Sequence, residues 1–231
     1  MNRSETYLKY EASRQGSAFK QGELLSKVIQ TRCIDFLYDE SNEIQSSSTE
    51  LQIHSFCIVL TQSCDLEGDF IVKHNNDIEE ISQKLKTGIE NSRQLSSSRR
   101  NELEKKLADL EGKYLNSIIL CEVDIAENVR RNSRKAMSTD AWNRVKINRD
   151  ERFHFLQAVP EECDHEQIGL PELTVDFKRI FSLDSNFLYY QVEQKIAERR
   201  TTLVSPYLEH FAYRYSTYLG QVALPEPHLS A

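Results

Sequence analysis

The sequence has 231 residues, with 36 Asp and Glu against 29 Lys and Arg, and its formal net charge at pH 7 is −7. Broad binding to nucleic acid depends on neutralising phosphates, so this composition argues against it and leaves only a local basic segment for such contacts. No apolar run approaches the roughly 18 residues of a membrane-spanning helix, and the N-terminal residues lack the apolar stretch of a signal peptide. We therefore expect a cytoplasmic protein without membrane contact, whose five cysteines are reduced and mostly buried.

The polar residues 1–18 predict an N-terminal arm, and residues 19–231 predict one domain. The stretch 23–38 is rich in apolar and β-branched residues, which predicts a strand. Residues 39–50 are acidic and Ser-rich, which predicts a flexible hairpin loop. The apolar residues 51–62 then predict a second strand, buried on both faces near its end.

The apolar residues take on a helical period in the range 76–114. Two stripes with a spacing of three or four residues are Ile78, Ile81, Leu85 and Ile89, then Leu103, Leu107, Leu110 and Tyr114. Because a Ser-rich turn separates them, the two stripes predict an inserted αα-hairpin. Each stripe is narrow, so the hairpin either packs on the main domain or contacts a protein partner or a second copy of the chain.

The second half of the chain adds strands and ends in a helix. Three further strands are expected, at residues 115–126, 153–159 and 173–183. The range 188–200 is ambiguous between strand and helix. Residues 205–220 predict a helix, because Ser205 suits the N-cap and Pro206 the first helical position. This order of elements predicts an α+β fold, a small barrel with an inserted helical hairpin and a C-terminal packing helix.

A thiol and a carboxylate, Cys64 and Asp65, stand where the second strand is expected to end, a place from which folds often present functional groups. A nucleophilic cysteine needs a base or a cation to form its thiolate. His154 is the best candidate base, because alternation along residues 152–156 separates it from the two flanking phenylalanines. Asp65 or Asp176 would orient its imidazole.

Three interpretations of this set stay open: nucleophilic catalysis, a metal site made by Cys64, Asp65 and His154, or a structural role. In the structural role, Asp65 caps the turn through backbone amides and Cys64 is a small packed residue. The sequence has no phosphate-binding loop, dinucleotide fingerprint, HExxH motif or CxxC pair, so we expect no cofactor.

The one clearly basic stretch is the range 128–152, which also holds the single tryptophan. Basic side chains and an aromatic ring together suit a phosphate backbone and one stacked base. The candidate RNA-binding residues are Arg130, Arg131, Arg134, Lys135, Trp142, Arg144, Lys146 and Arg149. The alternative is a solvated loop that balances the acidic surface elsewhere.

Four islands of the chain resemble an uncharacterised bacterial family: VLTQSCDL at 59–66, RFHFL at 152–156, VDFKRIFSL at 175–183, and SPYLEHFAYRYSTYLGQVALP at 205–225. A second resemblance is to the PemK/MazF-like small barrels of toxin–antitoxin systems. It rests on GELLSKVIQ at 22–30 and IVLTQS at 58–63. This resemblance implies an SH3-like barrel and an RNA-cleaving site that would include Thr61 and Ser63.

The missing catalytic signatures, the arm-like hairpin and the resemblance to toxin barrels favour an interaction module. We expect an adaptor subunit of a bacterial stress-response or anti-phage defence assembly. The alternative function is a toxin-like ribonuclease or a Cys-dependent hydrolase centred on Cys64, Asp65 and His154.

Overall fold

The computed structural model describes residues 9–38, 44–74, 76–90, 97–132 and 137–220. The chain is α+β, with one antiparallel sheet of seven strands in the order β1-β7-β2-β3-β4-β6-β5. The strands are β1 Tyr10–Ala12, β2 Glu23–Tyr38, β3 Ile44–Val59, β4 Ser117–Ile125, β5 Phe153–Leu156, β6 Leu173–Asp184 and β7 Glu198–Leu203. The helices are α1 Ser63–His74, α2 Asn76–Glu90, α3 Ser97–Glu111, α4 Ala126–Asn132, α5 Thr139–Lys146, α6 Ser185–Glu193 and α7 Tyr207–Gly220, with a short 3₁₀ helix, η2, at Glu161–Cys163.

The predicted α+β class is confirmed, but the sheet is open. Its edge strands β1 and β5 do not pair with each other in the described part of the chain, so a closed SH3-like barrel is not shown. The two edges nevertheless approach one another, because the Tyr10 hydroxyl donates to the carbonyl of Gln157, just after β5, at 2.9 Å. The sheet is therefore an incompletely closed one.

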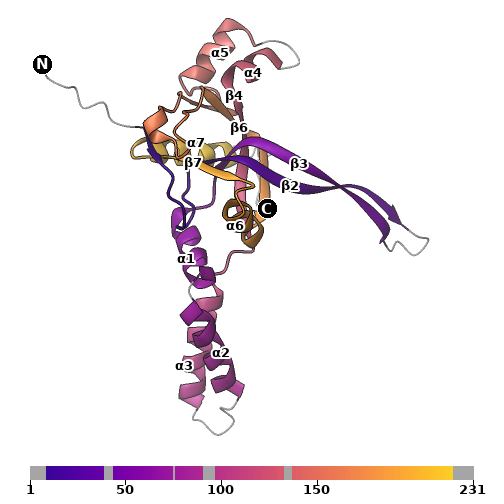
Figure 1. Cartoon of the computed structure of the whole chain (residues 1–231), viewed down its shortest axis with the longest axis vertical. Coiled ribbons are helices and arrows are strands. Elements are labelled where there is room, and N and C mark those ends of the chain that lie inside the picture. Colours follow the sequence, from indigo (N-terminus) through magenta and orange to yellow (C-terminus); the bar gives the residue numbers. More distant parts are fainter. Residues whose placement is uncertain (1–8, 39–43, 75, 91–96, 133–136, 221–231) are drawn as a thin grey trace, which may run out of the picture.

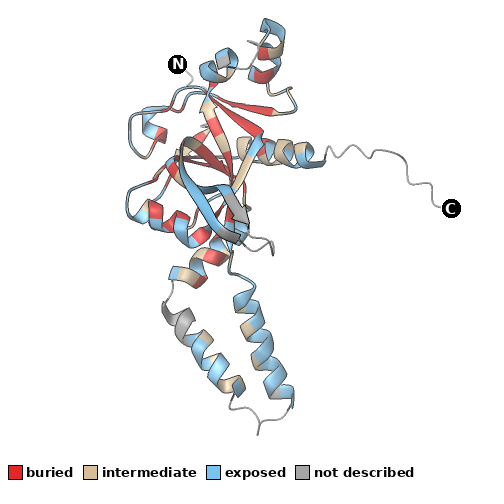
Figure 2. Cartoon of the chain, turned by 90° about the vertical axis from the view of Figure 1, so that its right-hand side faces the viewer, coloured by how far each residue is buried: buried red, intermediate tan, exposed pale blue. Residues whose placement is uncertain are grey.

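Each face of the sheet has its own hydrophobic core. Phe211 of α7 packs on one face with Ile58, whereas Leu66 of α1 and Leu188 of α6 pack on the other with Cys57. The adjacent residues of β3 thus point to opposite cores, as the pleat of a strand requires. Figure 2 shows the buried residues gathered in the sheet and in the helices beside it.

A third, smaller core lies under α4 and α5. Trp142 and Val145 of α5 pack there with Phe153 and Phe155 of β5. Ala126, at the start of α4, is buried in the same cluster. These helices cover the face of β5 that carries the two phenylalanines, which leaves His154 on the face of α7.

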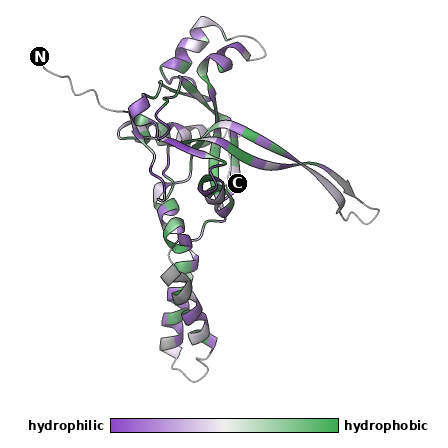
Figure 3. Cartoon of the chain, viewed as in Figure 1, coloured by the Kyte–Doolittle hydropathy of each residue, from purple (hydrophilic) through white to green (hydrophobic). Residues whose placement is uncertain are grey.

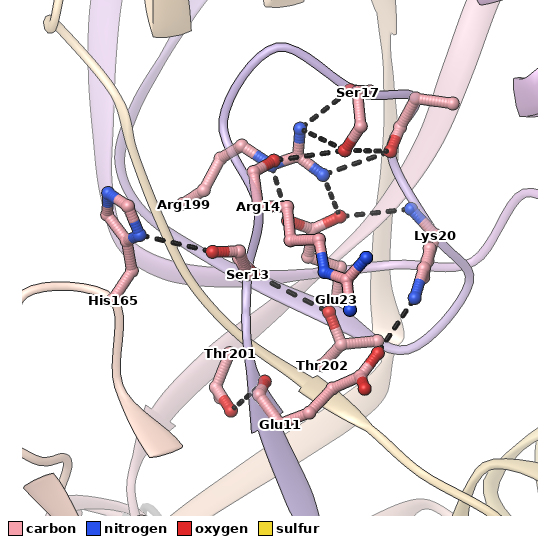
Figure 4. Close-up of polar contacts among 11 residues, drawn as sticks. Glu11, Ser13, Arg14, Ser17, Lys20, Glu23, His165, Arg199, Thr201 and Thr202 are labelled. Atoms are coloured by element: carbon pink, nitrogen blue, oxygen red, sulfur yellow. Dashed lines mark hydrogen bonds and ion pairs between the residues drawn. The ribbon is translucent and has the colours of Figure 1, made fainter. Parts of the chain in front are cut away.

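Two successive arginines of β7 fix the loops that flank the sheet. Arg199 forms a buried ion pair with Glu23 and also donates to the carbonyls of Ser17 and Ala18 (Figure 4). Arg200 donates through two nitrogens to the buried Asp164 at 2.8 and 2.7 Å. The loop after β1 and the loop around η2 are therefore both held by paired charges.

Two segments project from the body of the protein in different directions (Figure 1). One is the outer part of the β2–β3 hairpin, residues 29–38 and 44–53, which we call the ribbon. The other is the pair of helices α2 and α3, which occupies the predicted hairpin range 76–114. Figure 3 shows that hydrophobic residues lie along the ribbon near the sheet as well as within the sheet.

Several boundaries differ from the sequence prediction. The expected loop 39–50 is mostly strand, since β3 already begins at Ile44; residues 39–43 lie outside the described part. The strand expected over 51–62 ends at Val59, and α1 follows it. The polar arm expected over 1–18 contains β1, which pairs with β7. No helix among the described residues is long and apolar enough to cross a membrane.

Candidate functional site

The Ser-Cys-Asp-Leu motif forms the first turn of α1. Its Leu66 is fully buried, and the Ser63 hydroxyl accepts a hydrogen bond from the Gln21 amide at 3.0 Å. Cys64 and Asp65 are exposed, and the Cys64 Sγ lies 3.6 Å from Asp65 Oδ1. The motif therefore uses its outer residues to anchor the helix, while the thiol and the carboxylate face solvent.

The structure does not bring His154 to Cys64. His154 lies on β5, which β6 and β4 separate from β3, and three steps of about 4.8 Å between strands amount to roughly 14 Å. Its ring packs near Phe177 and Phe211, on the face covered by α7. Because α1 packs on the opposite face through Leu66, these two predicted residues lie on different sides of the sheet.

Asp176 is also separated from His154. In the β5–β6 register Asp176 lies opposite Phe153, and His154 lies opposite Val175, so the two side chains occupy opposite faces. Asp176 instead accepts from the Arg152 guanidinium, with Nε at 2.6 Å from Oδ1. The expected set of thiol, imidazole and orienting carboxylate is thus not assembled.

The groove around Asp176 has a volume of 570 Å³ and carries charges of both signs. Arg179 pairs with Glu122 at 2.8 Å and with Asp124 at 3.0 Å, while Arg152 pairs with Asp176. Each of these three carboxylates thus has an arginine partner, although Glu122 and Asp124 share Arg179. Within the described ranges no group of three or more His, Cys, Asp or Glu could hold a metal ion.

The basic segment is only partly available to a nucleic acid. Trp142 is buried and lies edge-on to Phe155, with ring centroids 6.2 Å apart, so it cannot stack on a base. Arg131 pairs with Glu127 within α4. Of the other candidates, Arg130, Arg144, Lys146 and Arg149 are exposed, whereas Arg134 and Lys135 lie outside the described residues.

The helices α2 and α3 of the hairpin partly bury each other's apolar stripes. Ile81 is exposed, but Leu85, Leu103 and Leu107 are half-buried where α2 and α3 face each other. The position of the Ile78 side chain lies outside the described part. The hairpin accordingly offers less free apolar surface than its sequence pattern predicts.

The ribbon presents the more exposed apolar face. Direct register pairs share a face, and so do every second residues along a strand. Ile29 pairs with Ile53, and Thr31 pairs with Leu51. Leu51 and Ile53 are each 66% exposed. The pairs on the other face are polar: Gln30 with Gln52 and Arg32 with Glu50.

The sequence pattern predicts a loop over 39–50 and a strand over 51–62, so it does not predict a long ribbon that carries Leu51 and Ile53 away from the sheet. The signal that could have found it is the alternation of Thr49, Leu51 and Ile53 with polar residues. Comparisons of the chain with protein-family models, curated proteins and solved structures find no match. The family resemblances stay predictions, and the functional argument rests on this geometry.

Proposed function

We propose that the chain is an interaction subunit that assembles with a second copy of itself through the apolar face of the ribbon. The observation that carries this proposal is the exposure of Leu51 and Ile53, each 66%, side by side on a two-stranded segment that stands away from the sheet. An isolated two-stranded hairpin is marginally stable in water. Contiguous exposed apolar surface of this kind marks interaction sites.

A second copy suits this face because the face carries no charge. Its members include Ile29, Thr31, Cys33, Ser47, Thr49, Leu51 and Ile53. Two such faces can pack against each other about a twofold axis without repulsion, as an isologous dimer requires. The charged residues Arg32 and Glu50 lie on the other face and would stay in solvent. The ribbon of each copy would then be covered by the ribbon of the other.

The test is the oligomeric state of the purified chain, measured by analytical ultracentrifugation. Leu51→Asp places a charge within the proposed interface, and Gln52→Asp places the same charge on the adjacent residue of the opposite face. We expect the wild type and Gln52→Asp to be dimers. An uncompensated buried charge costs roughly 3–5 kcal/mol, so Leu51→Asp should weaken the dimer at least about 100-fold.

A monomeric wild type would overturn the proposal, and so would equal dimerisation of both variants. Leu51 is largely exposed, so Leu51→Asp should leave the fold of the single chain intact. The role in a bacterial stress-response or anti-phage defence assembly stays a prediction. The enzymatic alternative has less support, because Cys64 and His154 lie on different sides of the sheet.

A further inference from the structure

A pocket of 240 Å³ lies where the two edges of the sheet approach each other without pairing. Its walls come from β1, β5, β7, the end of α5 and the first turn of α7. Tyr10 and Gln157 meet at one side of it, and Lys9 donates to the Gln157 side chain there. Leu203 and Tyr207 give the pocket an apolar wall.

The charge of this pocket is opposite to that of the whole chain. Its lining includes Lys9, Lys146, His154 and His210 and contains no Asp or Glu. The formal net charge of the chain is nevertheless −7. Basic side chains gathered without carboxylates raise the local concentration of anions.

One residue of the pocket lining, His154, has a buried polar atom without a partner. His154 is 3% exposed, and its Nδ1 has no hydrogen bond. Burial, together with the positive charges of Arg214 and His210, lowers the pKa of His154 to about 3. An anion in this pocket would lie among basic side chains that no carboxylate of the lining neutralises.

We propose that this pocket binds the phosphate group of a small phosphomonoester. The ammonium groups of Lys9 and Lys146 match the two charges of the phosphate, and the imidazoles of His154 and His210 supply further hydrogen-bonding atoms. Tyr207 and Leu203 would contact the organic part. A water molecule occupies about 30 Å³, so the volume of 240 Å³ suits a phosphate with a small substituent rather than a larger ligand.

The anion requirement is tested by isothermal titration calorimetry of the full chain with inorganic phosphate and phenyl phosphate. Phenol serves as the uncharged control. We expect saturable binding of both phosphates, with phenyl phosphate the tighter because of the apolar wall, and no binding of phenol. The absence of saturable phosphate binding would overturn the proposal, as would equal binding of phenol and phenyl phosphate.

Two variants place the binding in this pocket. Lys146→Ala removes an exposed charge at the end of α5, and His154→Phe replaces the buried imidazole with a ring of similar shape. A hydrogen bond to a charged group contributes about 1.5–3 kcal/mol, so each variant should weaken phenyl phosphate binding about tenfold or more. Lys105→Ala, on the exposed surface of α3, is the control and should bind as the wild type does.

Wild-type affinity in Lys146→Ala and His154→Phe would overturn the assignment to this pocket. If His154→Phe fails to fold, the comparison of Lys146→Ala with Lys105→Ala still decides the outcome. A 5′-phosphorylated oligonucleotide that binds where phenyl phosphate does not would overturn the small-molecule assignment in favour of a nucleic-acid end. The measurement does not depend on the oligomeric state, so its failure is distinct from failure of the proposed ribbon dimer.

Discussion

Replacing Arg199 with methionine should destabilise the fold by about 3–5 kcal/mol, because it leaves the Glu23 carboxylate buried without its partner. Arg199 Nε donates to Glu23 Oε1 at 2.6 Å, and Nη2 donates to Oε2 at 2.8 Å. Glu23 is 0% exposed, so water cannot replace the guanidinium. The carbonyls of Ser17 and Ala18 lose donors as well, but these residues are half-buried and water can reach them.

The size of this loss follows mainly from the orphaned charge. Domains unfold with a free energy of about 5–15 kcal/mol, so the variant should lose a large share of its stability. A double variant, Glu23→Leu with Arg199→Met, removes both charges and should lose much less than the sum of the single losses. The matched exposed pair, Lys27 with Glu198 at 2.6 Å, should contribute less than about 1 kcal/mol.

Urea unfolding followed by circular dichroism measures these differences, at one protein concentration because self-association shifts apparent stability. The cycle needs the wild type, Arg199→Met, Glu23→Leu and the double variant, with Lys27→Met as the exposed control. Strict additivity of the two single losses would refute the reasoning. A loss below about 1 kcal/mol in Arg199→Met would also refute it, since surface pairs already reach that size.

Three further changes test other contacts. The pKa of His154 is about 3 when folded and near 6.5 when unfolded. The folded state therefore binds fewer protons, so the free energy of unfolding falls by up to about 2 kcal/mol from pH 7 to pH 5. In urea unfolding, the free energy of His154→Phe should depend less on pH than that of the wild type. Equal pH dependence of the two proteins would contradict this. Gly22→Ala should destabilise the fold more than Gly16→Ala does. Both residues have positive φ, but only at Gly22 would the added Cβ meet a side chain, that of Leu208 at 2.8 Å. Equal changes in the thermal unfolding midpoint would exclude the clash. Ser138→Ala removes the N-cap of α5 and should cost about 1 kcal/mol by urea unfolding, whereas an unchanged midpoint would show that the cap is dispensable.

The elements predicted well from sequence are those that bury one clear face. The strand predicted over 23–38 is β2 itself, and the helix predicted from Ser205 begins at Tyr207 and buries Phe211. The alternation along β5 is also correct, since Phe153 and His154 point to different cores. In the inner part of β2, in β5 and in α7 the apolar residues face a core, so the local pattern and the tertiary packing agree. The outer part of β2 is exposed at residues 31–35, and its apolar and β-branched content alone predicts the strand there.

The elements that the sequence does not predict either are exposed on both faces or bury polar side chains. Residues 46–50 of β3 are exposed on both faces, and their Ser-rich sequence lacks the apolar alternation that marks a half-buried strand. Helix α1 was missed because its buried positions include Asp69, which accepts from the Leu115 amide at 2.8 Å and pairs with Lys73. A buried carboxylate has no signature in an apolar period.

The residues of the candidate catalytic set do not come together, and the sequence pattern of a single strand cannot predict this. Alternation correctly placed the His154 side chain on the face of β5 opposite to its flanking phenylalanines. Which other residues share that face, however, depends on the helix that covers it. That helix is α7, more than fifty residues later in the chain, whereas Cys64 belongs to a helix on the other face. Residues from different strands meet only as the sheet order and the covering helices allow.

The open edge of the sheet explains why the basic pocket exists at all. In a closed barrel, β1 and β5 would pair through their backbones and leave no room between them. Here the edges are joined by side chains, with Tyr10 bonded to Gln157, and the space beside that contact is the pocket. Lys9 and His154 come from these two edges, so the incomplete closure brings together basic residues about 145 positions apart in the sequence. The departure from the predicted barrel is thus the feature that supplies a site for an anion.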